Sequence, residues 1–259
     1  MPELFDMELR ALRRDRAFRA GPELFLLERA FADCLERIGL VPREFRSALL
    51  IGCPDSGWAR RLRELAAGVD VIDPGPLFAR AAGGTAAEED RLPPPGEAYD
   101  LCLAVGTLDT VNELQVALRR IRAAVAPDAL FIGALSGGET VPQLRAAMRA
   151  ADALAGQAVP HVHPRIEASA LAPLLAAAGF TSPVVDVDRA QVSYRSFGRL
   201  VADLRAMAAT SILRARSRKP LSREALAAAA AAFSAAGDGE RTTETFEILH
   251  FAAWTPGTS

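Results

Sequence analysis

The chain has 259 residues, and 50% of them are hydrophobic, so it can bury a large core, either as one large domain or as one domain with a helical appendage. A net charge of -2 and a pI near 6.0 argue against a general nucleic-acid binder. The three cysteines lie far apart and make neither a disulfide framework nor a zinc pattern, which favours a reducing cytoplasm. No apolar run approaches the roughly 20 residues that a membrane span needs.

Two helices are predicted before the first strand. Apolar residues recur at helical spacing over residues 3–40, and the pattern is interrupted at Gly21 and Pro22. The first of these helices carries a basic cluster made of Arg13, Arg14, Arg16 and Arg19. We interpret the cluster as a solvated face, and the alternative is a positive lid over an anionic or carboxylate-bearing ligand.

An uncharged apolar strand then runs into a glycine turn and a helix. Gly52 and Gly57 bracket the turn, and Asp55 or Ser56 can cap the first amides of the helix. In α/β proteins such a turn brings backbone N–H groups to a ligand at the carboxyl edge of a sheet. Pro54 interrupts this pattern because proline has no N–H to offer a ligand.

A second strand over 69–72 ends at Asp73, 21 positions beyond Gly52. At this spacing a nucleotide-binding α/β unit places an acidic residue for the ribose hydroxyls. A carboxylate suits that task because it accepts hydrogen bonds and never competes as a donor. The alternative is a turn aspartate, because Pro74 and Gly75 follow it, and the residues alone leave both interpretations open.

The rest of the chain alternates strands with helices. We expect a helix over 58–67, a loop over 81–97, strands over 99–105, 129–135, 183–188 and 244–254, and helices over 111–125, 141–154, 168–178, 197–207 and 223–233. This order predicts an α/β fold with a mainly parallel sheet that is covered on both faces. Asp186 and Asp188 alternate on one strand face and are interpreted as a polar edge. His161 and His163 lack a third ligand in sequence, so we expect no metal, and the two histidines either line a pocket or belong to a structural loop.

The order of elements resembles a class I S-adenosylmethionine-dependent methyltransferase, which has a seven-stranded Rossmann-like sheet. A narrower resemblance rests on motifs along most of the chain, among them Arg13-Arg14-Asp15-Arg16-Ala17, Val111-Asn112-Glu113-Leu114, Gly137-Gly138-Glu139-Thr140, Pro160-His161-Val162-His163-Pro164 and Trp254-Thr255-Pro256. These motifs resemble the complex I assembly factors that act as protein-arginine hydroxylases on a quinone-site subunit, and their bacterial methyltransferase-like relatives. Malonyl-carrier-protein methyltransferases are more distant cousins.

The resemblance implies a binding site for S-adenosylmethionine. It assigns the cofactor turn to Gly52, Cys53 and Gly57, the ribose-binding acid to Asp73, the adenine side to Glu88, Glu89 and Asp90, and the methyl or substrate pocket to Thr107, Leu108 and Asp109. Two positions depart from the family pattern. Leu50 stands where the family has a carboxylate, and Pro54 stands at the middle glycine. Either Asp55 supplies the carboxylate from a shifted position, or cofactor binding is weak or lost.

The expected domains are a helical cap over 1–42 and a methyltransferase-like domain over 43–259 with a helical insertion at 197–236. The resemblance implies an S-adenosylmethionine-dependent methyltransferase that acts on, or assembles, a protein partner such as a respiratory complex subunit. Two alternatives stay open: a non-catalytic assembly or binding protein with a degenerate cofactor loop, and a carrier-protein or small-molecule methyltransferase. The residues do not name a catalytic group or separate methylation from hydroxylation.

Overall fold

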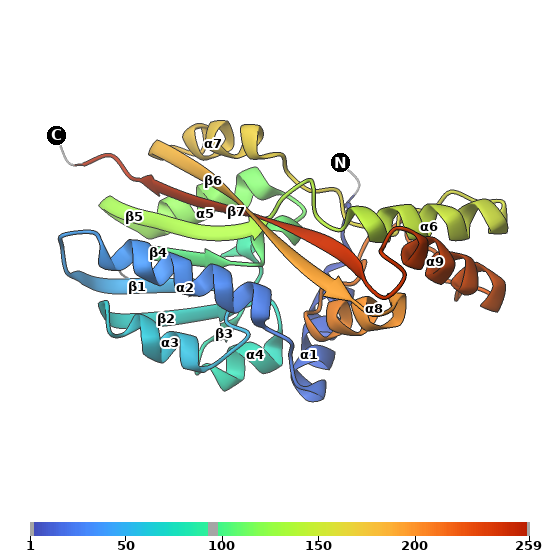
Figure 1. Ribbon diagram of the computed structural model, residues 1–259. Coiled ribbons are helices and arrows are strands. Elements are labelled where there is room, and N and C mark those ends of the chain that lie inside the picture. The colour runs from blue at the N-terminus through green and yellow to red at the C-terminus, as the bar shows by residue number, and fades with distance from the viewer. Residues whose placement is uncertain (1–2, 93–97, 258–259) are drawn as a thin grey trace. The chain divides into compact units, whose positions relative to one another are not determined.

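A single seven-stranded sheet organises the chain, which the computed structural model describes over residues 3–92 and 98–257. Figure 1 shows the strands, which follow the order β3-β2-β1-β4-β5-β7-β6. They are β1 (Phe45–Ile51), β2 (Ala66–Asp73), β3 (Thr85–Ala86), β4 (Tyr99–Val105), β5 (Val125–Ser136), β6 (Thr181–Tyr194) and β7 (Thr242–Trp254). The pairs β1–β2, β1–β4, β2–β3 and β4–β5 are parallel, and β7 is antiparallel to β5. The predicted mainly parallel Rossmann-like sheet is confirmed.

Helices connect the strands. They are α1 (Met7–Ala20), α2 (Phe25–Gly39), α3 (Gly57–Leu62), α4 (Pro76–Ala81), α5 (Leu114–Ala124), α6 (Pro142–Ala155), α7 (Ala168–Ala177), α8 (Phe197–Ala206) and α9 (Arg223–Ala235), with short 3₁₀ turns η1 (Glu89–Arg91) and η2 (Leu108–Thr110). Among the residues that the structure describes, none of these helices combines the length and apolarity needed to cross a membrane.

Strand β1 lies in the middle of the core because its side chains feed both layers around the sheet. Successive residues of a strand point to opposite faces. Leu50 packs in the cluster that α2 and α3 cover, whereas Leu49 and Ile51 belong to the cluster that α5 and α7 cover. An uncharged run is therefore required here, and the carboxyl end of β1 is held rigidly from both sides.

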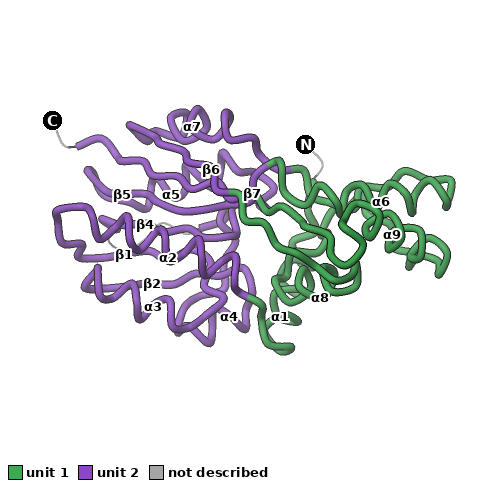
Figure 2. Tube along the Cα trace, viewed as in Figure 1, with its two compact units in different colours: residues 1–23, 138–164, 189–247 green, residues 24–137, 165–188, 248–259 purple. Residues whose placement is uncertain are grey.

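The chain forms two compact units, which Figure 2 colours separately. Unit 2 contains β1 to β5, helices α2 to α5 and α7, and parts of β6 and β7; it comprises residues 24–137, 165–188 and 248–259. Unit 1 contains α1, α6, α8 and α9 with the remainder of β6 and β7; it comprises residues 1–23, 138–164 and 189–247. Helices α1 and α2, which the sequence groups in one cap, belong to different units. The division into a cap over 1–42 and a domain over 43–259 stays a prediction.

Within unit 1, α6 and α9 pack against each other. Ala147 and Ala151 are buried on α6, and Ala225 and Ala229 are buried on α9. Small side chains let two helix backbones approach closely, so the alanine-rich composition of these helices has a packing role. The predicted helix over 223–233 is confirmed.

The predicted helix over 58–67 is wrong in its second half. Helix α3 ends at Leu62, and β2 already begins at Ala66, which pairs with Phe45. Gly68 lies opposite Ser47 inside the strand instead of ending a helix. Parallel pairing with β1 satisfies the backbone groups of these residues, and this tertiary contact overrides their helical propensity.

The loop predicted over 81–97 contains short regular elements. Strand β3 pairs with Ile72 and Asp73, and η1 follows it. The part of that prediction over 93–97 lies outside the described residues. Strand β6 extends beyond the predicted range 183–188 to Thr181 and Tyr194.

Candidate functional site

The turn after β1 is fixed by the close approach of the segment that follows β4. Gly52 has a φ of +82°, a conformation that L side chains rarely adopt. A Cβ at this position would lie 2.5 Å from the Val105 carbonyl oxygen and 2.7 Å from Thr107 Cγ2. The Gly52 amide donates a hydrogen bond to the Ile72 carbonyl, 2.9 Å away. Glycine is therefore needed so that the ends of β1, β2 and β4 can meet.

Asp73 joins the loops that follow β1 and β2. Its Oδ2 accepts a hydrogen bond from the Cys53 amide at 2.8 Å, and its Oδ1 accepts one from the Gly75 amide at 2.6 Å. The residue is fully buried. In this structure the carboxylate braces two backbone turns. A ribose could reach this buried side chain only when the loops open enough to expose it.

Asp55 stabilises its own turn. Its Oδ1 accepts a hydrogen bond from the Gly57 amide at 2.7 Å, and its carbonyl oxygen accepts from the Trp58 amide at 3.0 Å. The Asp55 side chain is exposed, so a carboxylate shifted to this position faces solvent. Leu50 and Pro54 are buried, which makes both departures from the family pattern part of the packed interior.

Three acidic residues lie beside the end of β2. The Ala87 amide donates to the Asp73 carbonyl at 3.2 Å, which places the following run next to the Asp73 turn. Glu89 is fully buried, and Glu88 forms an ion pair with Arg91 at 3.4 Å. Asp90 Oδ1 is buried and accepts no hydrogen bond from any residue that the structure describes. Because a buried carboxylate oxygen without a donor is costly, this atom is a candidate acceptor for a ligand N–H group.

The segment after β4 brings an unexpected ion pair to the same edge of the sheet. Thr107 and Leu108 are buried, as expected of residues that line a pocket or pack in the core. Asp109 pairs with Arg165, and both side chains are almost completely buried. Burial lowers the pKa of Arg165 to about 10. Ile166, which follows Arg165, bridges to Gly137 beyond the end of β5.

Sequence reasoning missed Arg165. Its only signal in the sequence is its place directly after the Pro160–Pro164 motif. The Arg165 Nε group is buried and finds no acceptor in the part of the chain that the structure describes. The segment 107–109, predicted to line a pocket, therefore contains the buried Thr107 and Leu108 and one member of a charge pair next to the end of β4.

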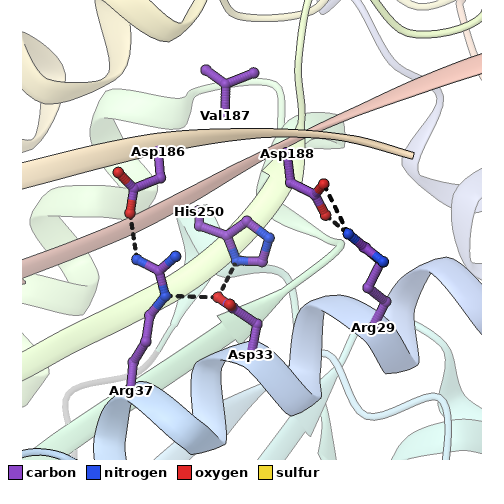
Figure 3. Close-up of a pocket in the computed structure, with 7 residues that line it drawn as sticks. All are labelled: Arg29, Asp33, Arg37, Asp186, Val187, Asp188 and His250. Carbon is purple, nitrogen blue, oxygen red and sulfur yellow. Dashed lines mark hydrogen bonds and ion pairs between the residues drawn. The ribbon is translucent and has the colours of Figure 1, made fainter. Parts of the chain in front are cut away.

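A charged groove lies between α2 and the strands β6 and β7, as Figure 3 shows. Arg29 forms two hydrogen bonds with Asp188, at 2.6 and 3.0 Å, and the pKa of Asp188 is lowered mainly by this contact. Arg37 contacts Asp186 at 2.5 Å and Asp33 at 2.7 Å. The groove has a volume of about 190 Å³ and is lined by Arg29, Asp33, Arg37, Asp186, Val187, Asp188 and His250. These pairs fasten α2 to the outer strands, and they give Asp186 and Asp188 a structural role.

His161 and His163 do not share a site. His161 Nε2 lies 2.9 Å from Asp152 Oδ1, whereas His163 Nε2 accepts a hydrogen bond from the Ile212 amide at 2.8 Å. No group of three or more His, Cys, Asp or Glu side chains within residues 3–92 and 98–257 has a geometry that could hold a metal ion. The two histidines fix different neighbours of their loop.

The sequence of this chain is similar to those of several known proteins. Over 244 residues the chain is 32% identical to the mitochondrial arginine-hydroxylase NDUFAF5 of Danio rerio, and the match covers 90% of this chain and 75% of that protein. The chain belongs to the NDUFAF5 family. The human NDUFAF5 arginine-hydroxylase is 30% identical over 97% of this chain and 76% of its own length. No protein-family model matches the chain.

Other relatives of this NDUFAF5-family protein are methyltransferases. A malonyl-[acyl-carrier protein] O-methyltransferase of Halorhodospira halophila is 28% identical over 97% of this chain and 89% of its own length. The YcgJ protein of Bacillus subtilis has a similar structure, with a TM-score of 0.58 and 10% identity over 88% of this chain and all of that chain. The N-methyltransferase NodS of Bradyrhizobium japonicum, in complex with S-adenosylhomocysteine, gives a TM-score of 0.51 and 16% identity over 97% of this chain and 100% of that chain. The predicted class I methyltransferase fold is confirmed.

Proposed function

We propose that this NDUFAF5-family protein binds S-adenosylmethionine at the carboxyl edge of its sheet and acts on a protein partner. The observation that carries the proposal is the buried Asp90 Oδ1, which belongs to the acidic run beside Asp73 and accepts no hydrogen bond from the residues described by the structure. An exocyclic amino group such as that of adenine has the N–H that this oxygen needs.

The residues fit the two ends of this cofactor differently. The nucleoside end would be held by Glu88, Glu89 and Asp90, with Asp73 as the acid near the ribose. The methionine end has fewer free groups, because the amides of Gly52, Cys53 and Gly57 already donate to acceptors within the chain. Thr107 and Leu108 would lie next to the reactive group.

The cofactor, when bound, would supply an activated methyl group. The chain would contribute by binding and orientation, because alignment of the reacting atoms provides much of the rate of a methyl transfer. Buried Thr107 and Leu108 would keep water away from that position. The Asp109–Arg165 pair would hold the segment after β4 in place.

Isothermal titration calorimetry with S-adenosylmethionine and S-adenosylhomocysteine tests the proposal. We expect binding to the wild-type chain and a loss of roughly 1–3 kcal/mol in Asp90→Ala, which corresponds to about 5- to 150-fold in Kd. Glu64→Ala removes the same charge from an exposed position and should leave Kd unchanged. Absence of binding to the wild-type chain up to millimolar ligand would overturn the cofactor proposal.

The partner we propose is a protein, in particular a subunit of respiratory complex I. The similarity to NDUFAF5 proteins over most of the chain supports this proposal. A deletion strain should accumulate incomplete complex I on native gels, and mass spectrometry of its subunits would identify a missing methyl or hydroxyl group. Normal assembly with unmodified subunits would refute a role for this partner. The location we propose is the cytoplasm, supported by the three cysteines, which are buried and form no disulfide.

A non-catalytic assembly protein is the second candidate. The closed turn favours it: Asp73 is fully buried by its own loops, and Pro54 offers no amide. In that case Asp90→Ala would restore complex I in the deletion strain as well as the wild-type chain does. A carrier-protein methyltransferase, suggested by the Halorhodospira relative, would instead leave unmethylated malonyl carrier protein in the deletion strain.

A further inference from the structure

A cluster of positive charge surrounds the first turns of α1 in unit 1. Arg10 and Arg14 are 4% and 7% exposed, and Arg13 lies on the same face of the helix. Arginines three and four positions apart are neighbours on a helix, and like charges at this spacing destabilise it. Burying several guanidinium groups together is costly unless acceptors or anions compensate.

Arg13 carries a buried donor that no residue within 3–92 and 98–257 accepts. Its Nη1 is buried and has no hydrogen-bond acceptor among the residues that the structure describes. Burial, and then the charges of Arg216 and Arg16, lower the pKa of Arg13 to about 10. Asp6 acts in the opposite direction, but its carboxylate already accepts from the Leu9 amide at 3.0 Å and from Arg216 at 3.1 Å. Positive charge therefore exceeds negative charge around this guanidinium.

The surroundings of His163, which lies in a different segment, show the same excess of positive charge. The ring is 3% exposed, packs edge-on against Phe5 at 5.3 Å, and accepts a hydrogen bond from the Ile212 amide through Nε2. Burial, followed by the charges of Arg13 and Arg10, lowers its pKa to about 4. The imidazole is thus neutral near pH 7 and does not add to the positive charge.

We propose that Arg13 is the recognition residue of an oxyanion-binding site in unit 1, which takes a ligand bearing a carboxylate or phosphate group. The planar guanidinium can form two parallel hydrogen bonds to either group, and the buried Nη1 supplies one of them. The anion would offset the repulsion that Arg216 and Arg16 exert on Arg13. This site is independent of the turn at 52–57 and goes beyond the proposed cofactor binding.

Thermal unfolding of the whole chain tests the site. Inorganic phosphate and malonate are added separately, and potassium chloride of equal ionic strength is the reference. We expect one of the two anions to raise Tm by a few degrees in the wild-type chain, because a ligand that binds only the folded state stabilises it. The effective anion distinguishes a phosphate-bearing ligand from a carboxylate-bearing one. Arg13→Gln should lose this rise, and Arg19→Gln, on the exposed side of α1, should keep it.

The His163 pKa, measured by NMR, gives a second reading. Arg13→Gln should raise this pKa from about 4, and the effective anion should raise it in the wild-type chain. Arg13→Lys keeps the charge but lacks the planar fork, so it should bind the anion at least about tenfold more weakly while changing the pKa little. The proposal is overturned if neither anion exceeds the chloride reference, or if Arg13→Gln or Arg13→Lys responds to the anion as the wild-type chain does.

Discussion

Replacing Asp73 tests whether its carboxylate stabilises the loops after β1 and β2 or serves only to bind a ribose. Asp73→Ala leaves the amides of Cys53 and Gly75 buried without their carboxylate acceptor. Each of the two stranded amides costs roughly 1–3 kcal/mol, so we expect the free energy of unfolding to fall by about 2–6 kcal/mol. Asp73→Asn keeps one acceptor oxygen and turns an NH₂ group toward the other amide, so its loss should be intermediate.

Urea unfolding without any ligand measures this loss as a change in the transition midpoint at constant m. Asp55→Ala is the matched control. It removes a carboxylate that also accepts a backbone hydrogen bond in the same turn, but at an exposed position, so its cost should stay below about 1 kcal/mol. If Asp73→Ala is no more destabilising than Asp55→Ala, the brace is refuted, and a role in ribose binding alone is favoured.

Two further predictions concern other buried charges. The pKa of His163 lies near 4 in the folded chain and near 6.5 in the unfolded chain, so protonation of this ring favours unfolding. The free energy of unfolding should therefore rise by at most about 3 kcal/mol as the pH increases from 4 to 6.5. Urea titrations of the wild-type chain and His163→Gln across this range should differ in slope, and parallel curves would contradict the assignment. Arg165→Met should cost about 3–5 kcal/mol because it leaves Asp109 buried without its cation. Adding Asp109→Leu should recover most of that loss, and a double variant no more stable than Arg165→Met would argue against the pair.

The turn after β1 was predictable because an uncharged apolar run followed by Gly52 marks it in the sequence. An uncharged run fixes the strand, and Gly52 is required by its positive φ and by the nearby Val105 carbonyl. The position of Asp73 at the end of β2 followed in the same way from spacing. The direction of its carboxylate did not, since that depends on where the amides of two separate loops point.

Contacts between distant segments explain the remaining differences. The start of β2 at Ala66 is set by pairing with Phe45 and not by the helical propensity of its own residues. Arg165 meets Asp109 only because Ile166 bridges to the end of β5. Such partners have no spacing rule in the sequence, so the sheet could be predicted but the charge pair at its edge could not.

The ion pairs in the groove beside α2 also affect whether another chain can add a strand to the sheet at β6. Strand β6 is the last in the sheet and is 14 residues long, and a long edge strand is a template on which another chain can add a strand. Asp186 and Asp188 place fixed carboxylates on this strand, and Arg29 and Arg37 hold them through α2. A strand that approached β6 would meet charges that are costly to desolvate, so these ion pairs disfavour aggregation through the open edge.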